Sequence, residues 1–122
     1  MASEGFHEPV ELLTPEVIER HRAITSLMEE LEAVDWYDQR VSASTDAELR
    51  EVLAHNRDEE KEHAAMTLEW LRRHDPKWDE MLRTYLFTDE PIIEVEEEAE
   101  SGDSNGRKVA LQIGNLRQEP ER

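Results

Sequence analysis

A glutamate and a histidine three residues apart, Glu60 and His63, are the side chains of this sequence best suited to hold a metal ion. On an α-helix, residues three apart lie on one face, so the carboxylate and the imidazole would project side by side. In helical bundles this Glu-x-x-His pair combines with single glutamates from neighbouring helices to build carboxylate-bridged two-metal sites. Glu30 is the single glutamate that an earlier helix offers. The three residues make half of such a site.

The spacing of apolar residues predicts that these three side chains face inward. Glu60 and His63 continue a line of three- and four-residue steps that runs from Leu49 to Trp70. Glu30 belongs to a comparable line from Ala23 to Tyr37. A carboxylate buried without a partner costs several kcal/mol or neutralises itself. The spacing alone leaves both a metal site and interhelical salt bridges open as the compensation.

Two long helices must position these residues. A start signal at Thr14-Pro15-Glu16, with Thr14 as N-cap, precedes a helical pattern that continues to about Arg40. A loop over residues 41–44 follows, and a capping box with Thr45 as N-cap and Glu48 at N3 opens a second helix. That helix runs to about residue 74. The short loop predicts an antiparallel hairpin.

The remaining signals are short. Asp75 and Pro76 open a short third helix, and Pro91 marks another break that can start a last helical turn or two. We therefore predict an all-α fold: an antiparallel two-helix hairpin plus a short C-terminal helix. A dimer of such hairpins would be a four-helix bundle, with Glu30, Glu60 and His63 of both copies around two metals.

The overall composition excludes several classes of protein. The chain has 122 residues and carries 31 Asp and Glu against 14 Lys and Arg, a net charge of −17. Nucleic-acid binding needs a basic surface, so no nucleic-acid partner is expected. No apolar run approaches the ~18–20 residues that span a bilayer. The absence of cysteine excludes disulfides, thiolate zinc sites and iron–sulfur clusters. No secretory signal is recognisable, so we expect a cytoplasmic protein without a membrane partner. With so few apolar residues, self-association is the expected way to complete the core.

The composition changes along the chain and predicts three segments. Residues 1–98 form the helical body, 99–108 a flexible acidic linker rich in Gly and Ser, and 109–122 a tail. The tail begins with ten largely apolar residues, VALQIGNLRQ. Chain ends are usually polar, so this tail indicates a docking segment.

Three long blocks of the sequence resemble the encapsulated ferritins of bacteria and archaea. They are EELEAVDWYDQR at 29–40, HNRDEEKEHAAMTLEWLRR at 55–73 and LRTYLFT at 82–88. The resemblance implies a ferritin-like domain with ferroxidase activity, in which Fe(II) is oxidised to Fe(III) at a di-iron centre between subunits, with two irons per dimer. It also implies an annular decamer built from dimers. This assembly acts in the lumen of an encapsulin nanocompartment, where iron is mineralised and stored.

The resemblance also assigns roles to individual residues. The ferroxidase ligands fall on Glu30, Glu60 and His63, and Tyr37 matches a tyrosine beside the di-iron centre. Calcium or another divalent cation is a candidate occupant of two further sites. The residues that match the first of these, a site where metal enters, are Glu29 and Glu32, with Trp36 near it. Those that match the second, an outer metal site, are His55, Glu59 and Glu62. For the outer triplet, a solvated charged face stays open as an alternative.

The tail resembles the short peptides that target cargo proteins to encapsulin shells. The matching segment, LQIGNLR at 111–117, has three apolar side chains, Leu111, Ile113 and Leu116, with Gly114 among them. Residues 118–122 extend beyond the usual end of such peptides. The resemblance therefore implies an encapsulin shell protein as partner, bound through the C-terminal peptide.

Two other functions stay open on the residues alone. The hairpin could be a non-enzymatic acidic scaffold or adaptor, with Glu60 and His63 in interhelical salt bridges. It could also bind manganese or zinc, as a peroxidase or as a metal buffer.

Overall fold

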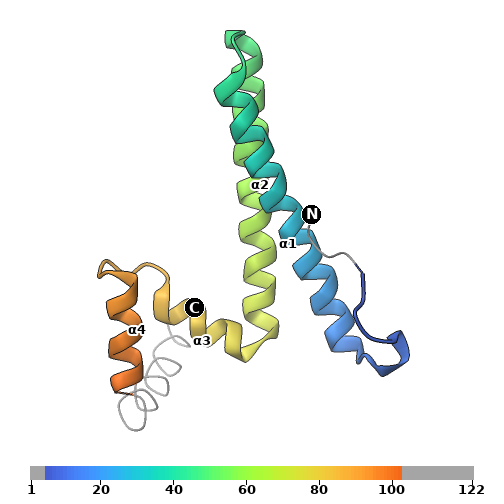
Figure 1. The fold of residues 1–122 in the computed structure, drawn as a ribbon, viewed down its shortest axis with the longest axis vertical. Coiled ribbons are helices and arrows are strands. Elements are labelled where there is room, and N and C mark those ends of the chain that lie inside the picture. Colours follow the sequence, from blue (N-terminus) through green and yellow to red (C-terminus); the bar gives the residue numbers. More distant parts are fainter. Residues whose placement is uncertain (1–4, 103–122) are drawn as a thin grey trace. The chain divides into compact units, whose positions relative to one another are not determined.

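The computed structural model of the chain describes residues 5–102, and within this range every regular element is helical. A 3-10 turn, η1 (Val10–Leu12), precedes two long helices, α1 (Pro15–Ala43) and α2 (Ala47–His74), which form a hairpin (Figure 1). Two shorter helices follow, α3 (Pro76–Tyr85) and α4 (Ile92–Ser101). The all-α prediction is confirmed.

The chain divides into two compact units, Met1–His74 and Asp75–Arg122. The first unit holds the hairpin of α1 and α2, and the second holds α3 and α4. None of the helices within residues 5–102 combines the length and the apolar character that a bilayer crossing requires.

The first helix begins where the sequence predicts. The Thr14 hydroxyl accepts a hydrogen bond from the Val17 amide at 3.2 Å, and a proline occupies the first helical position. The predicted end at Arg40 is wrong by three residues, because α1 continues to Ala43. Nothing in Val-Ser-Ala breaks a helix, and the turn closes only where the Ser44 amide donates to the Arg40 carbonyl.

The N-cap of α2 differs from the prediction. Asp46, and not Thr45, caps the helix: its carboxylate accepts the Leu49 amide at 2.8 Å, and its carbonyl accepts the Arg50 amide. A carboxylate is a strong acceptor and its charge complements the positive end of the helix dipole. The capping box therefore gives way to a single acidic cap one residue later.

The second unit begins with a cap that the sequence predicts correctly. The Asp75 carboxylate accepts the amides of Lys77 and Trp78 at 3.0 and 3.3 Å. After α3, Phe87 has a φ of 62° in the left-handed region and a fully exposed side chain. A positive φ is uncommon for a bulky residue. The helix has already ended before Phe87, because Leu86 is extended.

The last helix is longer than predicted. With ten residues, α4 spans nearly three turns, and it reaches Ser101, inside the segment predicted as a linker. Residues 103–108 of that linker and the whole 109–122 tail lie outside the described residues. The three segment boundaries stay a prediction.

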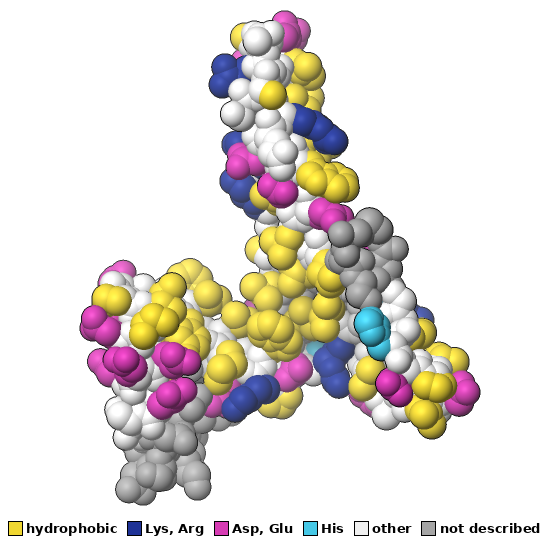
Figure 2. Space-filling model, in the orientation of Figure 1, with side chains coloured by type: hydrophobic (Ala, Val, Ile, Leu, Met, Phe, Trp, Pro, Cys, Tyr) yellow, Lys and Arg dark blue, Asp and Glu magenta, His cyan; other side chains and the backbone are white. Residues whose placement is uncertain are grey.

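The hairpin buries little of its apolar surface. Within the described residues, Ala64 and Leu71 are the buried hydrophobic side chains. Large apolar residues on both helices, among them Leu31, Val52 and Met66, stay more than half exposed. Figure 2 shows such side chains open on the surface of the hairpin. The fold of one chain is thus an incomplete core.

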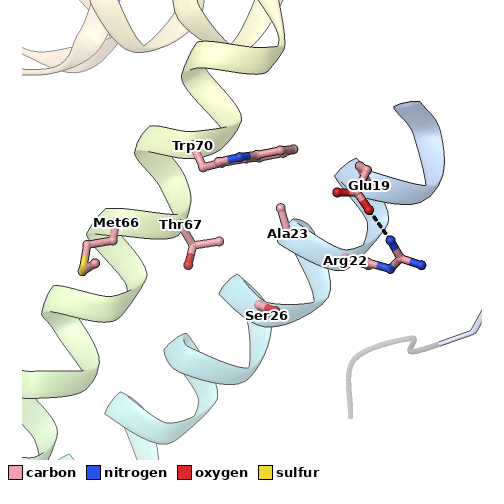
Figure 3. A pocket seen from close by; sticks show the side chains of 7 residues that line it. All are labelled: Glu19, Arg22, Ala23, Ser26, Met66, Thr67 and Trp70. Atoms are coloured by element: carbon pink, nitrogen blue, oxygen red, sulfur yellow. Dashed lines mark hydrogen bonds and ion pairs between the residues drawn. The ribbon is translucent and has the colours of Figure 1, made fainter. Parts of the chain in front are cut away.

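The two long helices separate along their length. In Figure 1 they run side by side next to the loop and diverge toward the start of α1 and the end of α2. An open groove of about 380 Å³ lies between the diverging parts (Figure 3). In that view, the Trp70 ring extends from α2 toward α1, while Arg22 on α1 pairs with Glu19. The groove residues are Glu19, Arg22, Ala23, Ser26, Met66, Thr67 and Trp70.

Candidate metal centre

Glu30, Glu60 and His63 converge across the hairpin. The Nδ1 atom of His63 lies 3.5 Å from Oε2 of Glu30 and 3.6 Å from Oε1 of Glu60. One ligand atom from each residue lies within 4.8 Å of the other two. Glu60 and His63 meet because they are three apart on α2, whereas Glu30 is brought to them by the packing of α1 against α2. The structure therefore gathers the three residues that the sequence predicts as ligands.

The three side chains differ in their exposure to solvent. The side chains of Glu30 and Glu60 are 23% and 26% exposed, and that of His63 is 48% exposed. The two carboxylates are thus partly withdrawn from water, and the cluster keeps an open side. An ion held by one chain would have three protein ligands and room for more.

The pKa of the Glu30 carboxyl is raised above its usual value. The main cause is the side-chain hydrogen bond with Glu60, and partial desolvation and the negative charge of Glu60 act in the same direction. His63 acts in the opposite direction and lowers the pKa of Glu30. Two carboxylates this close do not both ionise without compensation. A divalent cation between them would supply that compensation.

The donor set restricts the class of metal. Two carboxylate oxygens and one imidazole nitrogen suit borderline-hard first-row cations, including Fe(II), Mn(II) and Zn(II). The ligands of one chain do not choose among these ions.

Tyr37 lies two turns beyond Glu30 on the same helix. The Arg40 guanidinium lies over its ring, 5.3 Å from the centroid. Within the described residues, no hydrogen bond or ion pair joins Tyr37 to the three ligands. Its role beside the centre stays a prediction.

The residues predicted for metal entrance stay on the surface of α1. Glu29 is exposed and Glu32 is half-buried, and both neighbour Glu30 in sequence. Trp36 is half exposed and lines a shallow pocket together with Gln39, Arg40 and Ala43. Their roles at a metal entrance stay a prediction.

The outer triplet is only partly assembled. His55 Nε2 lies 3.7 Å from Glu59 Oε2, and both side chains are largely exposed. Glu62 is exposed one turn further along α2. Among the described His, Asp and Glu residues, the group of three that could hold a metal ion is Glu30, Glu60 and His63. The outer site likewise stays a prediction.

A second contact between the helices was not predicted. Arg57 on α2 donates from Nη1 to Oδ1 of Asp38 on α1 at 3.0 Å, and from Nε to its neighbour Asp58 at 3.1 Å. The sequence carries no signal that singles out this pair, because many charged residues occupy facing positions of the predicted hairpin.

The sequence of the chain matches a known protein family. Residues 5–89, more than half of the chain, match the family model described as EncFtn-like. The chain belongs to the EncFtn-like family. The resemblance to encapsulated ferritins in the sequence is thereby confirmed.

Two curated relatives support the same placement of this EncFtn-like chain. An encapsulated ferritin-like protein of Rhodospirillum rubrum is 65% identical over 109 residues, which cover 89% of this chain and 78% of the relative. A ferritin-like protein of Thermotoga maritima is 58% identical over 103 residues, covering 84% and 90% of the two chains.

A solved structure supports the ferritin-like fold of the EncFtn-like chain. It is protein ne0167 from Nitrosomonas europaea, with a TM-score of 0.70 and 62% identity, and the match covers 72% of this chain and 97% of the other. The family and the three converging ligands together indicate an iron-related, ferritin-like role with a candidate metal centre.

Proposed function

We propose that the protein is a ferroxidase that oxidises Fe(II) to Fe(III) with dioxygen at a di-iron centre shared by two subunits. The convergence of Glu30, Glu60 and His63 in a chain of this family is the observation that carries the proposal. One chain supplies two carboxylates and one imidazole, which is half of the ligand set of a two-metal site in a helical bundle. A two-fold contact would bring the same three residues of a second copy to the same place.

The apolar surface of the hairpin supports this assembly. Leu31, Val52 and Met66 are more than half exposed in the single chain, and the described core is small. Covering such side chains with a second hairpin would stabilise the pair by roughly 25 cal/mol per Å² of apolar surface removed from water. Dimerisation would therefore complete core and centre together, as the first step toward the annular decamer that the family resemblance implies.

Charge balance supports two divalent ions. The dimer would contribute four carboxylates from Glu30 and Glu60, which match the charge of two Fe(II) ions. The negative charges of Glu30 and Glu60, which lie close together in the single chain, would then attract the substrate. The acidic chain would also draw cations toward the centre.

The reaction balances with two irons. Two Fe(II) ions give two electrons to one O₂, and two protons complete hydrogen peroxide, leaving two Fe(III). Two further Fe(II) ions and two further protons would reduce the peroxide to water. His63 would bind iron through a ring nitrogen.

The other assignments belong to the same proposal. Tyr37 would lie beside the di-iron centre and hydrogen-bond a ligand or donate an electron. Glu29 and Glu32 would guide metal inward at an entrance, with Trp36 near them. A separate outer site would hold metal through His55, Glu59 and Glu62.

Aerobic addition of Fe(II) to the metal-free protein tests this proposal. A ferroxidase binds about one iron per chain, takes up O₂ and develops ferric absorbance; the ratio of iron to O₂ tells peroxide from water. A metal buffer or a manganese or zinc protein would bind metal without Fe(II)-dependent O₂ uptake. A scaffold would bind no stoichiometric metal, and either result refutes the proposal.

We further propose that the protein is cargo of an encapsulin shell. The support is the segment Leu111–Arg117, which resembles targeting peptides, and the relative named as encapsulated. Deletion of residues 109–122 should leave Fe(II) oxidation intact and prevent co-purification with a co-expressed shell protein. Unchanged shell loading would contradict the cargo role and leave the ferroxidase proposal standing.

A further inference from the structure

The guanidinium of Arg57 bridges two helices. Its Nη1 atom contacts Asp38 on α1, while its Nε atom contacts Asp58 on its own helix. The side chain of Arg57 is only 22% exposed, although that of Asp38 is 66% exposed. The two carboxylates raise the pKa of Arg57, and Arg57 lowers the pKa of Asp58, as expected for a charge held on two sides. A planar guanidinium that donates to carboxylates on two sides is held in a more defined orientation than a lysine ammonium would be.

This contact lies beside the candidate metal centre. Arg57 precedes Glu60 by three residues, and Asp38 follows Glu30 by eight, so the ion pair stands about one to two helical turns from the ligands, on the side of the loop. On the other side, the open groove begins within four residues of the ligands, at Ser26 on α1 and Met66 on α2. Along the two helices, the three ligands therefore lie between the ion pair and the groove.

At the metal centre, the alignment of α1 along α2 must be closely fixed. A slip of one residue moves α1 along α2 by about 1.5 Å and turns a side chain by about 100°. Metal–ligand distances tolerate only about 0.2 Å. Beyond the ligands the open groove lies between the two helices, so the contact of Arg57 with Asp38 holds α1 and α2 together on the loop side.

We propose that Arg57 is a positioning residue for the metal centre, which acts through Asp38 to hold α1 and α2 in the register that sets Glu30 opposite Glu60 and His63. This inference rests on the proposed metal-binding function. Arg57 would not contact the metal; it would fix the position of Glu30, the ligand on α1. The main effect of the ion pair is on the alignment of the two helices. It adds little to the free energy of unfolding, because partly exposed ion pairs contribute little.

Titration of the metal-free, full-length protein with Co(II), followed by visible absorption, tests the inference. Arg57→Gln and Asp38→Asn should each weaken Co(II) binding about 10- to 100-fold, the range typical of residues that orient ligands, and should change the Co(II) spectrum. The double variant should be no worse than either single one, because both remove the same contact. Arg57→Lys should restore part of the affinity.

The matched control is Lys61→Gln. Lys61 pairs with Asp58 within α2, 3.3 Å apart, and does not reach α1 in that contact. The Lys61→Gln variant should bind Co(II) like the wild type. Far-UV circular dichroism and sedimentation should show unchanged helix content and assembly in all variants.

The outcomes distinguish a failure of the positioning role from a failure of the proposed metal-binding function. Wild-type affinity and spectrum in both Arg57→Gln and Asp38→Asn would overturn the positioning role. Weakened binding that accompanies lost helix content or assembly would also overturn it, since the pair would then be merely structural. A wild-type protein that neither binds Co(II) nor oxidises Fe(II) would refute the proposed function itself.

Discussion

The hairpin of α1 and α2 and the pair of short helices α3 and α4 are both acidic, yet they arrange their carboxylates differently. In the hairpin, Glu30 and Glu60 approach each other from two helices and are partly withdrawn from water. On α4 the glutamates follow one another along one short helix, and all are exposed: Glu94, Glu96, Glu97, Glu98 and Glu100. Figure 2 shows acidic side chains gathered over that helix.

The difference shows what turns carboxylates into a site. Successive residues of a single helix point in directions about 100° apart, so a run of glutamates spreads around the helix and stays solvated. Convergence needs a second element that faces the first. The side-chain hydrogen bond with Glu60, desolvation and the negative charge of Glu60 then raise the pKa of Glu30. A cation is favourable at such a place.

The largest expected effect concerns this contrast directly. Glu30→Ala, Glu60→Ala or His63→Ala should each lower the initial rate of Fe(II) oxidation at least about 100-fold, because a direct ligand matters more than the outer partners that cost 10- to 100-fold. The triple change of Glu96, Glu97 and Glu98 to Gln removes more charge and should leave the rate within about twofold. Stopped-flow ferric absorbance measures both. Comparable losses in the two sets would mean that net charge, and not the convergent site, drives the reaction.

The two units should also differ in how much a hydrophobic side chain stabilises them. Leu71 in α2 is fully buried, so Leu71→Ala should cost about 2–5 kcal/mol of unfolding free energy. Phe87 after α3 is fully exposed, and Phe87→Ala should change stability by less than about 0.5 kcal/mol. Urea titration of the two variants gives both values. A large loss for Phe87→Ala would reveal that another copy covers that side chain.

Helix caps provide a smaller and more local comparison. Asp46→Ala should cost about 1 kcal/mol, because it removes the acceptor of the Leu49 amide at the start of α2. Asp75→Ala, which removes the acceptor of two amides at the start of the shorter α3, should cost a similar amount. Thr45→Ala is the control and should be nearly neutral. Thermal unfolding that ranks Thr45→Ala as the most damaging of the three would restore the capping box inferred from the sequence.

The smallest expected effect is a pH dependence of the metal-free protein. Because the pKa of Glu30 is raised in the folded state, the folded chain holds the proton more tightly than the unfolded chain. This contribution to stability is complete below the ordinary glutamate pKa of 4.5 and is lost as the pH rises through the folded value. Glu30→Gln should therefore gain Tm relative to the wild type on going from pH 4 to pH 7 in the presence of a chelator. An equal difference at both pH values would mean that Glu30 is not strained by Glu60.

Much of the local structure could be predicted because helical periodicity and caps are short-range properties. The spacing of apolar residues predicts both long helices, and the Thr14 and Asp75 caps are placed correctly. Thr45 is wrong as a cap because the next residue, Asp46, is also a good cap, and its carboxylate accepts the Leu49 amide one position further along. The predicted end of α1 comes three residues too early. The helix continues to Ala43 because no residue between Arg40 and Ala43 forbids a helix.

The Arg57–Asp38 pair marks the limit of such prediction. The two residues are nineteen positions apart, and many charged residues on two acidic helices offer equally plausible partners. Which of them meet depends on how the helices cross, and a one-residue change of register would choose other pairs.

The sequence by itself determined that two long helices form and that Glu60 and His63 share one face, because a three-residue step on an α-helix always brings side chains together. Only the tertiary structure decided that Glu30 stands opposite them, with its carboxylate 3.5 Å from the imidazole. That distance depends on the register and separation of α1 and α2. Both result from packing and from cross-helix contacts such as Arg57 with Asp38, which act between residues far apart in the chain.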